Sequence, residues 1–153
     1  MADNGKIKAI VFDWIGTLYE RDVGLFSWST EIVGELTRRK YDLALISAAP
    51  DGNFDGRMNQ IQDTGISRYF DTIVVDITKT QKIFDTCIRG LGYVSEEVAV
   101  VDDIATKGIR IGKQLGCTTF WIQKGDRSHL LPNEESGEPD YKIDDVREVL
   151  KIL

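Results

Sequence analysis

Short apolar runs alternate along this chain with segments in which apolar residues recur every three or four positions. The runs are rich in Val, Ile and Leu and mostly lack polar residues, as expected for strands that are covered on both faces. They predict five strands, at 7–12, 43–47, 72–75, 98–101 and 118–122. Strands that alternate with helices predict a Rossmann-like three-layer α/β/α sandwich with a mostly parallel central sheet and right-handed crossovers.

The segments between the strands show the periodicity of amphipathic helices. Trp28, Ile32, Val33 and Leu36 fall on one face of a first helix, with charged residues between them. Further helices are predicted at 58–64, 80–91, 104–115 and 146–153. The segment 18–27 is long enough only for a loop or a small hairpin, and 124–140 holds glycines and prolines typical of irregular structure.

Length and composition narrow the class of protein. A chain of 153 residues with 42% hydrophobic content predicts a single domain over 1–153. It has no apolar run near the ~20 residues of a membrane span, and its N-terminus does not resemble a signal peptide. Cys87 and Cys117 lack metal-ligand spacing, which favours a reduced, cytoplasmic setting. A net charge of −6 argues against a nucleic-acid footprint or an anionic membrane surface.

Polar residues with useful chemistry follow three of the predicted strands. Asp13 follows the first strand and Ser47 ends the second. Asp102 and Asp103 follow the fourth, and two adjacent like charges are unfavourable unless a cation or hydrogen bonds offset their repulsion. Ligands of open α/β sheets bind at the carboxyl ends of strands, and carboxylates suit Mg²⁺. Simple turn-capping by Asp13 and helix N-capping by Asp103 stay open as alternatives.

The segment 12–18, Phe-Asp-Trp-Ile-Gly-Thr-Leu, resembles the first motif of the haloacid dehalogenase-like (HAD) phosphohydrolases, Asp-x-Asp-Gly-Thr-Leu. Leu43–Ser47, the lysine-containing stretch 78–84, the Asp102–Asp103 pair and the ending 139–146 are similar to the later motifs, in the same order. The resemblance covers nearly the whole chain. It implies that Asp13 is the nucleophile and that Mg²⁺ is held by Asp13, the Ile15 backbone carbonyl, Asp103 and Asp102. It implies phosphate contacts from Gly16, Thr17, Ser47, Ala48 and Lys79.

Two lysines compete for the role of the motif lysine. Aligning Ile83-Phe84 with the family pattern places the lysine at position 78, so that Lys79 is one residue out of register. Lys82 is the alternative, although its position is typical of a helix surface, and we favour Lys79. Lys107 stands where many members of the family carry a further metal-ligating acid or asparagine, and an ammonium group cannot ligate Mg²⁺.

Ile15 is the main departure from the family pattern. The aspartate that it replaces protonates the leaving oxygen and later activates water, a contribution of about 10²–10⁴-fold for general acid–base catalysis. Isoleucine can do neither. We therefore expect that phosphoryl groups with good leaving groups still react, that alkyl phosphomonoesters react slowly, and that an aspartyl-phosphate persists.

The rival families fit less well. The string Phe-Asp-Trp-x-Gly-Thr resembles phosphonoacetaldehyde hydrolases, but those enzymes need a lysine from a helical cap, and neither 19–41 nor 50–71 is long enough to contain one. The chain is therefore expected to have no cap domain. A receiver-type phospho-acceptor domain would carry its acidic pair after the first strand, whereas here the pair comes late.

The sequence thus predicts a Mg²⁺-dependent phosphohydrolase or phosphotransferase of reduced or restricted activity. The alternative is a catalytically impaired relative that acts as a binding or regulatory partner. Expected partners are a phosphorylated small molecule or macromolecule, without nucleic acid or membrane. The oligomeric state stays open, a homo-oligomer included.

Overall fold

The computed structural model describes residues 6–125 and 127–153. Its central sheet has six strands, all parallel, in the order β5-β4-β1-β6-β7-β8. The strands are β1 (Ala9–Phe12), β4 (Asp42–Ala48), β5 (Thr72–Asp76), β6 (Val98–Asp102), β7 (Thr118–Ile122) and β8 (Tyr141–Ile143). The five predicted strands and the α/β fold class are confirmed, and β8 adds a short edge strand.

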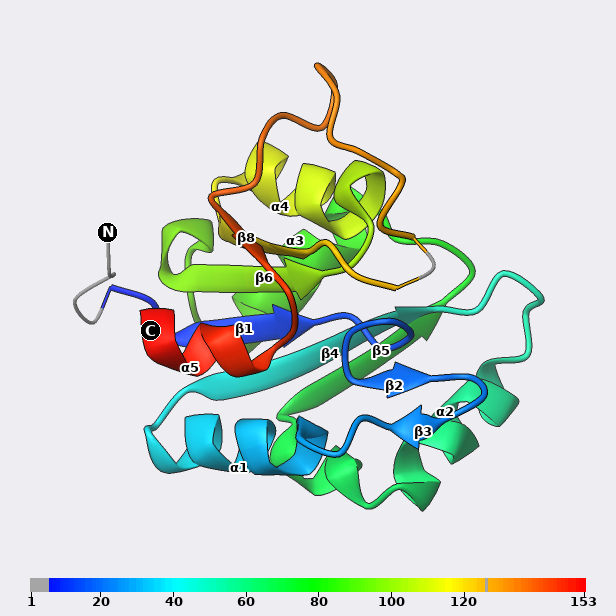
Figure 1. The fold of residues 1–153 in the computed structure, drawn as a ribbon. Helices are drawn as coiled ribbons and strands as arrows, with labels where there is room; N and C mark the ends of the chain where they lie inside the picture. Colours follow the sequence, from blue (N-terminus) through cyan, green and yellow to red (C-terminus); the bar gives the residue numbers. More distant parts are fainter. Residues whose placement is uncertain (1–5, 126) are drawn as a thin grey trace.

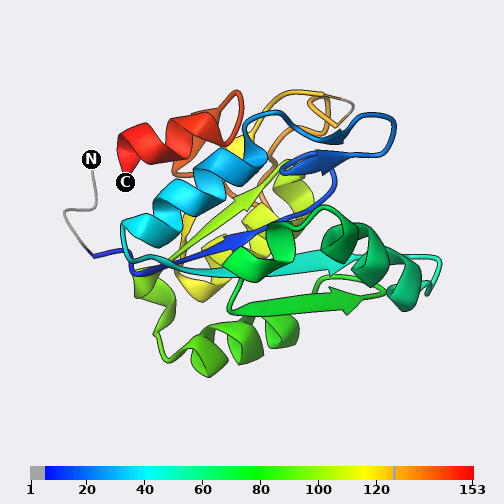
Figure 2. The same ribbon diagram turned by 90° about the horizontal axis from the view of Figure 1, so that it is seen from below.

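Helices cover both faces of the sheet (Figures 1 and 2). Figure 2 shows α1 and α5 on one side of the sheet and α3 on the other. The helices are α1 (Ser29–Arg38), α2 (Phe54–Asp63), α3 (Gln81–Leu91), α4 (Arg110–Leu115) and α5 (Arg147–Ile152), with 3₁₀ turns at Ile66–Tyr69 and Ser95–Glu97. None of these helices is long and apolar enough to span a membrane.

Alternate residues of the central strands supply the two halves of the core. Ile10 and Phe12 of β1 pack with α1 and α5, whereas Ala9 and Val11 pack with α3 and α4. All four are essentially inaccessible to solvent. This two-sided burial explains why the sequence of β1 is continuously apolar, and it fixes the strand whose end carries Asp13.

The two segments in which a cap domain was considered, 19–41 and 50–71, hold only small elements in the described structure. Between β1 and α1 lies a hairpin formed by β2 (Tyr19–Glu20) and β3 (Gly24–Leu25), so of the loop and the small hairpin predicted for 18–27, the structure has the hairpin. Between β4 and β5 lie only α2 and the 3₁₀ turn Ile66–Tyr69. In Figure 1 the hairpin lies on the side toward which the arrowheads of β1 and β6 point.

Two helix predictions need correction. The helix predicted at 58–64 begins at Phe54, because the Asn53 side chain accepts a hydrogen bond from the Gly56 amide and caps it. The single helix predicted at 104–115 is a π-helical turn, Ala105–Ile109, followed by α4. Such wide turns occur often at functional sites, and this one begins two residues after Asp103.

Candidate active site

The candidate site lies where the strand order reverses. From β1 the chain builds outward through β4 and β5, and then returns to the other side of β1 to form β6 and β7. Asp13 directly follows β1, and Asp102 is the last residue of its neighbour β6. Because both strands run parallel, their carboxyl ends meet at one edge of the sheet, which is where ligands of open α/β sheets bind.

The structure brings Asp13, Asp102 and Asp103 into one buried cluster. Each offers one carboxylate oxygen, and these oxygens all lie within 4.8 Å of one another. Asp102 and Asp103 are each only 1% exposed. Three carboxylates so close together repel one another in a medium that screens charge poorly, so cations or bound protons must offset the repulsion.

Lys79 supplies one of these cations. Its Nζ donates hydrogen bonds of 2.7 Å to Asp13 Oδ1 and 2.7 Å to Asp102 Oδ2, and its side chain is 7% exposed. Lys79 precedes α3, whose N-cap is Thr80. Lys82, the alternative, is exposed and lines a different groove beside β5. Of the two lysines, only Lys79 contacts the acidic cluster.

The pKa values of the three acids are pushed apart. Burial alone would raise the pKa of Asp13, but the Lys79 ammonium group brings it below the ordinary value. Burial and the charge of Asp13 raise the pKa of Asp102, against the opposing effect of Lys79. Burial, together with the charges of Asp13 and Asp102, raises the pKa of Asp103 to about 9. Lys79 therefore stabilises an ionised Asp13, as a nucleophile requires.

Asp103 is the acid that most lacks a compensating charge. Its Oδ2 accepts a 3.3 Å hydrogen bond from Arg127 Nη1, whereas its Oδ1 is buried without a hydrogen-bond partner. A buried carboxylate oxygen without a partner costs free energy. Oxygen ligands in this number suit a hard divalent cation such as Mg²⁺. The described residues thus fit such an ion, with Asp13, Asp102 and Asp103 as its side-chain ligands.

Two glycines allow the acids to sit this deep. A Cβ on Gly16 would lie 2.0 Å from Asp103 Oδ2, and Gly16 adopts a φ of +85°. A Cβ on Gly108, in the π-helical turn, would lie 1.9 Å from Asp102 Oδ2. Both positions therefore need glycine, Gly16 for its backbone conformation as well as for space.

The predicted phosphate contacts lie around the same cluster. Thr17 Oγ1 donates a 3.2 Å hydrogen bond to Asp13 Oδ2. Ser47, at the end of β4, is 1% exposed, and its Oγ accepts a 2.7 Å hydrogen bond from Arg57 Nη1. The same Arg57 nitrogen donates a 2.7 Å bond to the Ala48 carbonyl. These residues come together as the sequence predicts, and their roles toward phosphate stay predictions.

Ile15 is 8% exposed and lines the cavity beside Asp13. The turn around it is closed by hydrogen bonds from the Gly16 amide to the Tyr19 carbonyl and from the Tyr19 amide to the Trp14 carbonyl. Neither bond uses the Ile15 carbonyl, so ligation of a metal by that carbonyl stays a prediction. The side chain at position 15, where the resemblance found in the sequence would place an acid, is thus apolar and lies beside Asp13.

The cavity beside Asp13 has a volume of about 250 Å³. Its lining includes five basic side chains: Arg21, Arg57, Lys79, Lys107 and Arg127. A groove of about 890 Å³ between β5 and α3 is larger but does not contain the acidic cluster, so volume alone does not identify the site.

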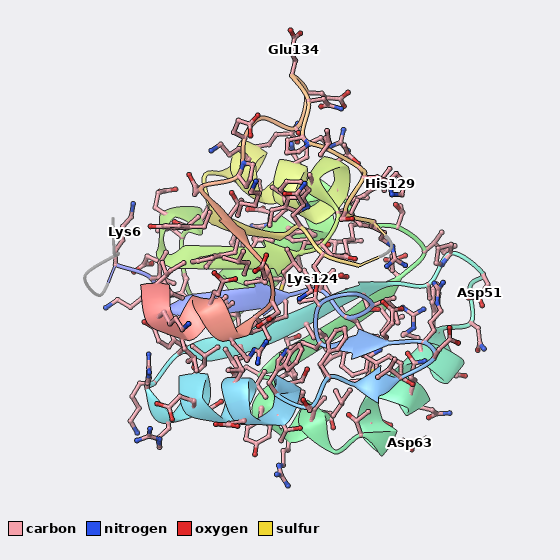
Figure 3. All side chains as sticks on the ribbon, viewed as in Figure 1. Lys6, Asp51, Asp63, Lys124, His129 and Glu134 are labelled. Atoms are coloured by element: carbon pink, nitrogen blue, oxygen red, sulfur yellow. The ribbon has the colours of Figure 1, made fainter. Side chains whose placement is uncertain are left out.

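The sequence analysis missed three of these cations. Arg21 lies in the turn between β2 and β3, Arg57 in α2 and Arg127 in the irregular segment between β7 and β8. The Asn53 cap signal could have placed Arg57 in the first turns of a helix that follows Ser47. No local pattern marks Arg21 or Arg127. His129 and Lys124, in the same segment as Arg127, are exposed (Figure 3).

The fold is thus a parallel α/β sandwich whose switch point carries an acidic cluster and a lysine. The model of the haloacid dehalogenase-like hydrolases matches residues 1–122. The chain therefore belongs to the haloacid dehalogenase-like hydrolase family.

Curated relatives of this chain include two phosphatases. It is 32% identical over 94 residues to glyceraldehyde 3-phosphate phosphatase of Methanopyrus kandleri, an alignment that covers 58% of this chain and 40% of the relative. It is 25% identical over 130 residues to phosphoserine phosphatase of Thermus thermophilus, covering 82% and 49%. The chain thus spans less than half the length of these relatives.

Among solved structures, a HAD phosphatase from Thermococcus onnurineus superposes with a TM-score of 0.77 at 19% identity. The superposition covers 95% of this chain and 97% of that one. At this identity the likeness shows the fold alone.

Proposed function

We propose that this chain is a Mg²⁺-dependent phosphohydrolase or phosphotransferase that acts through an aspartyl-phosphate on Asp13. The observation that carries the proposal is the convergence of Asp13, Lys79 and the Asp102–Asp103 pair, from three separate parts of the chain, at one buried point. Membership of the hydrolase family and the two phosphatases among the relatives support it.

In this mechanism the Asp13 carboxylate attacks phosphorus and the bond to the leaving oxygen breaks. Lys79 keeps Asp13 ionised, and the Ser47 hydroxyl and the Ala48 backbone orient the phosphoryl oxygens. Bound Mg²⁺ would neutralise charge on the phosphoryl group, held by the carboxylates of Asp13, Asp102 and Asp103. Water then hydrolyses the aspartyl-phosphate and regenerates Asp13.

Ile15 sets the limits of the activity. It can neither protonate the leaving group nor activate the attacking water, so both steps lack a contribution of about 10²–10⁴-fold. We therefore propose that the enzyme acts on phosphoryl groups whose leaving groups depart without protonation, such as aryl or acyl phosphates.

The test compares turnover of 4-nitrophenyl phosphate with Mg²⁺ by the wild type, Asp13→Asn and Ile15→Asp. We expect Asp13→Asn to abolish turnover and Ile15→Asp to raise it by at least tenfold, because the new carboxylate adds the missing acid–base group. Equal rates for the wild type and Asp13→Asn would refute the proposal.

A second candidate function is supported by Ile15 itself. A chain that keeps the acidic cluster but lacks the acid–base residue could serve as a phosphate-dependent binding or regulatory protein. The Ile15→Asp variant separates the two: a binding protein whose site is otherwise misaligned gains no turnover from the added carboxylate.

A further inference from the structure

The basic side chains around the cavity are more numerous than the acidic cluster requires. Lys79 is paired with Asp13 and Asp102, and Arg127 is paired with Asp103. The other three, Arg21, Arg57 and Lys107, form no ion pair with any residue of the described chain. Three cations, of which Arg21 and Lys107 are exposed, therefore line one cavity without an ion-pair partner among the described residues.

Arg57 is held in this position by neutral groups. Its Nη1 donates to Ser47 Oγ and to the Ala48 carbonyl, both at 2.7 Å. Burial lowers the pKa of Arg57, and the nearby charge of Arg21 lowers it further, against smaller opposing effects of Asp13 and Asp51. Asp51 lies on the exposed loop before α2 (Figure 3). Guanidinium groups gathered in this way favour binding of an anion.

The charge count exceeds what one phosphoryl group neutralises. Five cations line the cavity, and of the three carboxylates of the cluster only Asp13 is among its described lining residues. A bound divalent cation would add two further positive charges. The cavity of about 250 Å³ has room for roughly eight waters at ~30 Å³ each. Charge and space both favour a compact ligand with two anionic groups.

The chemistry of Ile15 also favours a ligand with a second anionic group. A leaving group that receives no proton from the enzyme must depart as an anion, and its negative charge grows as the bond to phosphorus breaks. Unpaired cations placed around that oxygen stabilise the developing charge in place of a general acid. Arg21, Arg57 and Lys107 are the described cavity cations free to do so.

Building on the proposed function, we propose that the substrate is a compact phosphoanhydride whose second phosphate, held by Arg21, Arg57 and Lys107, is the leaving group. A carboxylate oxygen of Asp13 forms a bond to the first phosphorus. The bridging P–O bond breaks, and its electron pair leaves with the second phosphate. Water later supplies the oxygen that replaces Asp13 on the first phosphorus, so that one phosphoanhydride and one water yield two phosphate groups.

The binding test uses two ligands that cannot be hydrolysed in this way, methylenediphosphonate and methylphosphonate, titrated calorimetrically at constant free Mg²⁺. We expect the diphosphonate to bind the wild type at least tenfold more tightly than the monophosphonate. Arg57→Gln and Lys107→Gln should each reduce this preference by fivefold or more. Lys82→Gln removes a lysine that lies outside the cavity and should leave the preference unchanged. Equal affinities in the wild type, or a preference kept by both cavity variants, would overturn the proposal.

Turnover separates this proposal from the proposed function. We expect Arg57→Gln and Lys107→Gln to lower kcat/KM for inorganic pyrophosphate by at least tenfold more than for 4-nitrophenyl phosphate. Equal losses on the two substrates would refute the phosphoanhydride proposal and leave the hydrolase intact. If neither substrate turned over while the diphosphonate preference persisted, the hydrolase would be refuted and the site for two anions would stand.

Discussion

Single residues decide how the acids of this site can be packed. Gly16 and Gly108 lie against Asp103 and Asp102, and a Cβ at either would overlap a carboxylate oxygen. Lys79 bridges Asp13 and Asp102. Gly16 therefore has two separable functions. It adopts a positive φ, and because it lacks a Cβ it leaves room for Asp103, which follows the neighbouring strand β6.

A pair of glycine variants tests whether Gly16 is needed for the space beside Asp103 as well as for its positive φ. Gly16→Ala and Gly24→Ala both place alanine at a positive φ, +85° and +92°, but only Gly16 faces an atom within 4 Å. We expect Gly24→Ala to lower the free energy of unfolding by about 1–2 kcal/mol. Gly16→Ala should lower it by about 1–3 kcal/mol more, because the added methyl displaces Asp103. Urea denaturation measures both, and equal losses would contradict the close packing of Gly16 and Asp103.

At the scale of elements, the site is assembled from the ends of β1, β4 and β6 and the start of α3. Thr80 caps α3 by accepting a 3.2 Å hydrogen bond from the Ile83 amide. Lys79, immediately before the cap, thereby has a fixed backbone position from which to reach the acids. The capped helix end and the lysine therefore belong to one structural unit.

Removal of the Thr80 cap should lower the free energy of unfolding. We expect Thr80→Ala to lower the free energy of unfolding by about 1 kcal/mol, the usual value of such a cap. Thr86→Ala, at an exposed position within α3, should be neutral or slightly stabilising because alanine is the better helix former. Chemical denaturation of both variants checks this, and similar losses would show that the hydrogen bond of Thr80 contributes nothing.

Elements with a strong local pattern were predictable, and those set by distant contacts were not. The five strands follow from continuous apolar runs, and α3 from its periodicity and its end at Gly92. The Gly56 in the first turn of α2 hid the start of that helix. The π-helical turn after β6 depends on close packing of Gly108 against Asp102, which no local spacing reveals.

The residues of the site divide in the same way, into those marked by a local sequence pattern and those placed by distant contacts. Asp13, Ser47 and the Asp102–Asp103 pair were predictable because each lies at or just after the end of a strand, and Lys79 because it directly precedes a predicted helix. Arg57 and Arg127 reach the cavity through contacts with Ser47 and Asp103, at 10 and 24 residues' separation. Such long-range contacts depend on how the elements pack, so the sequence pattern alone did not identify these two cations.

At the scale of the whole molecule, an ion at the switch point would join β1 to β6 and oppose unfolding. A ligand that binds only the folded state stabilises it by about 2.7 kcal/mol at a hundredfold excess over Kd. We expect Mg²⁺ to raise the Tm of the wild type and to raise that of Asp103→Asn much less. Asp85→Asn, on the exposed side of α3, is the control and should respond as the wild type does. An unchanged response of Asp103→Asn would place the ion elsewhere.

The central claim is that Asp13 becomes phosphorylated, and mass spectrometry of the intact protein tests it most directly. After incubation with acetyl phosphate and Mg²⁺, we predict one added phosphoryl group that maps to Asp13 and is absent from Asp13→Asn. It should persist longer in the wild type than in Ile15→Asp, because Ile15 cannot activate water. An unmodified wild type, or equal labelling of Asp13→Asn, would contradict the account.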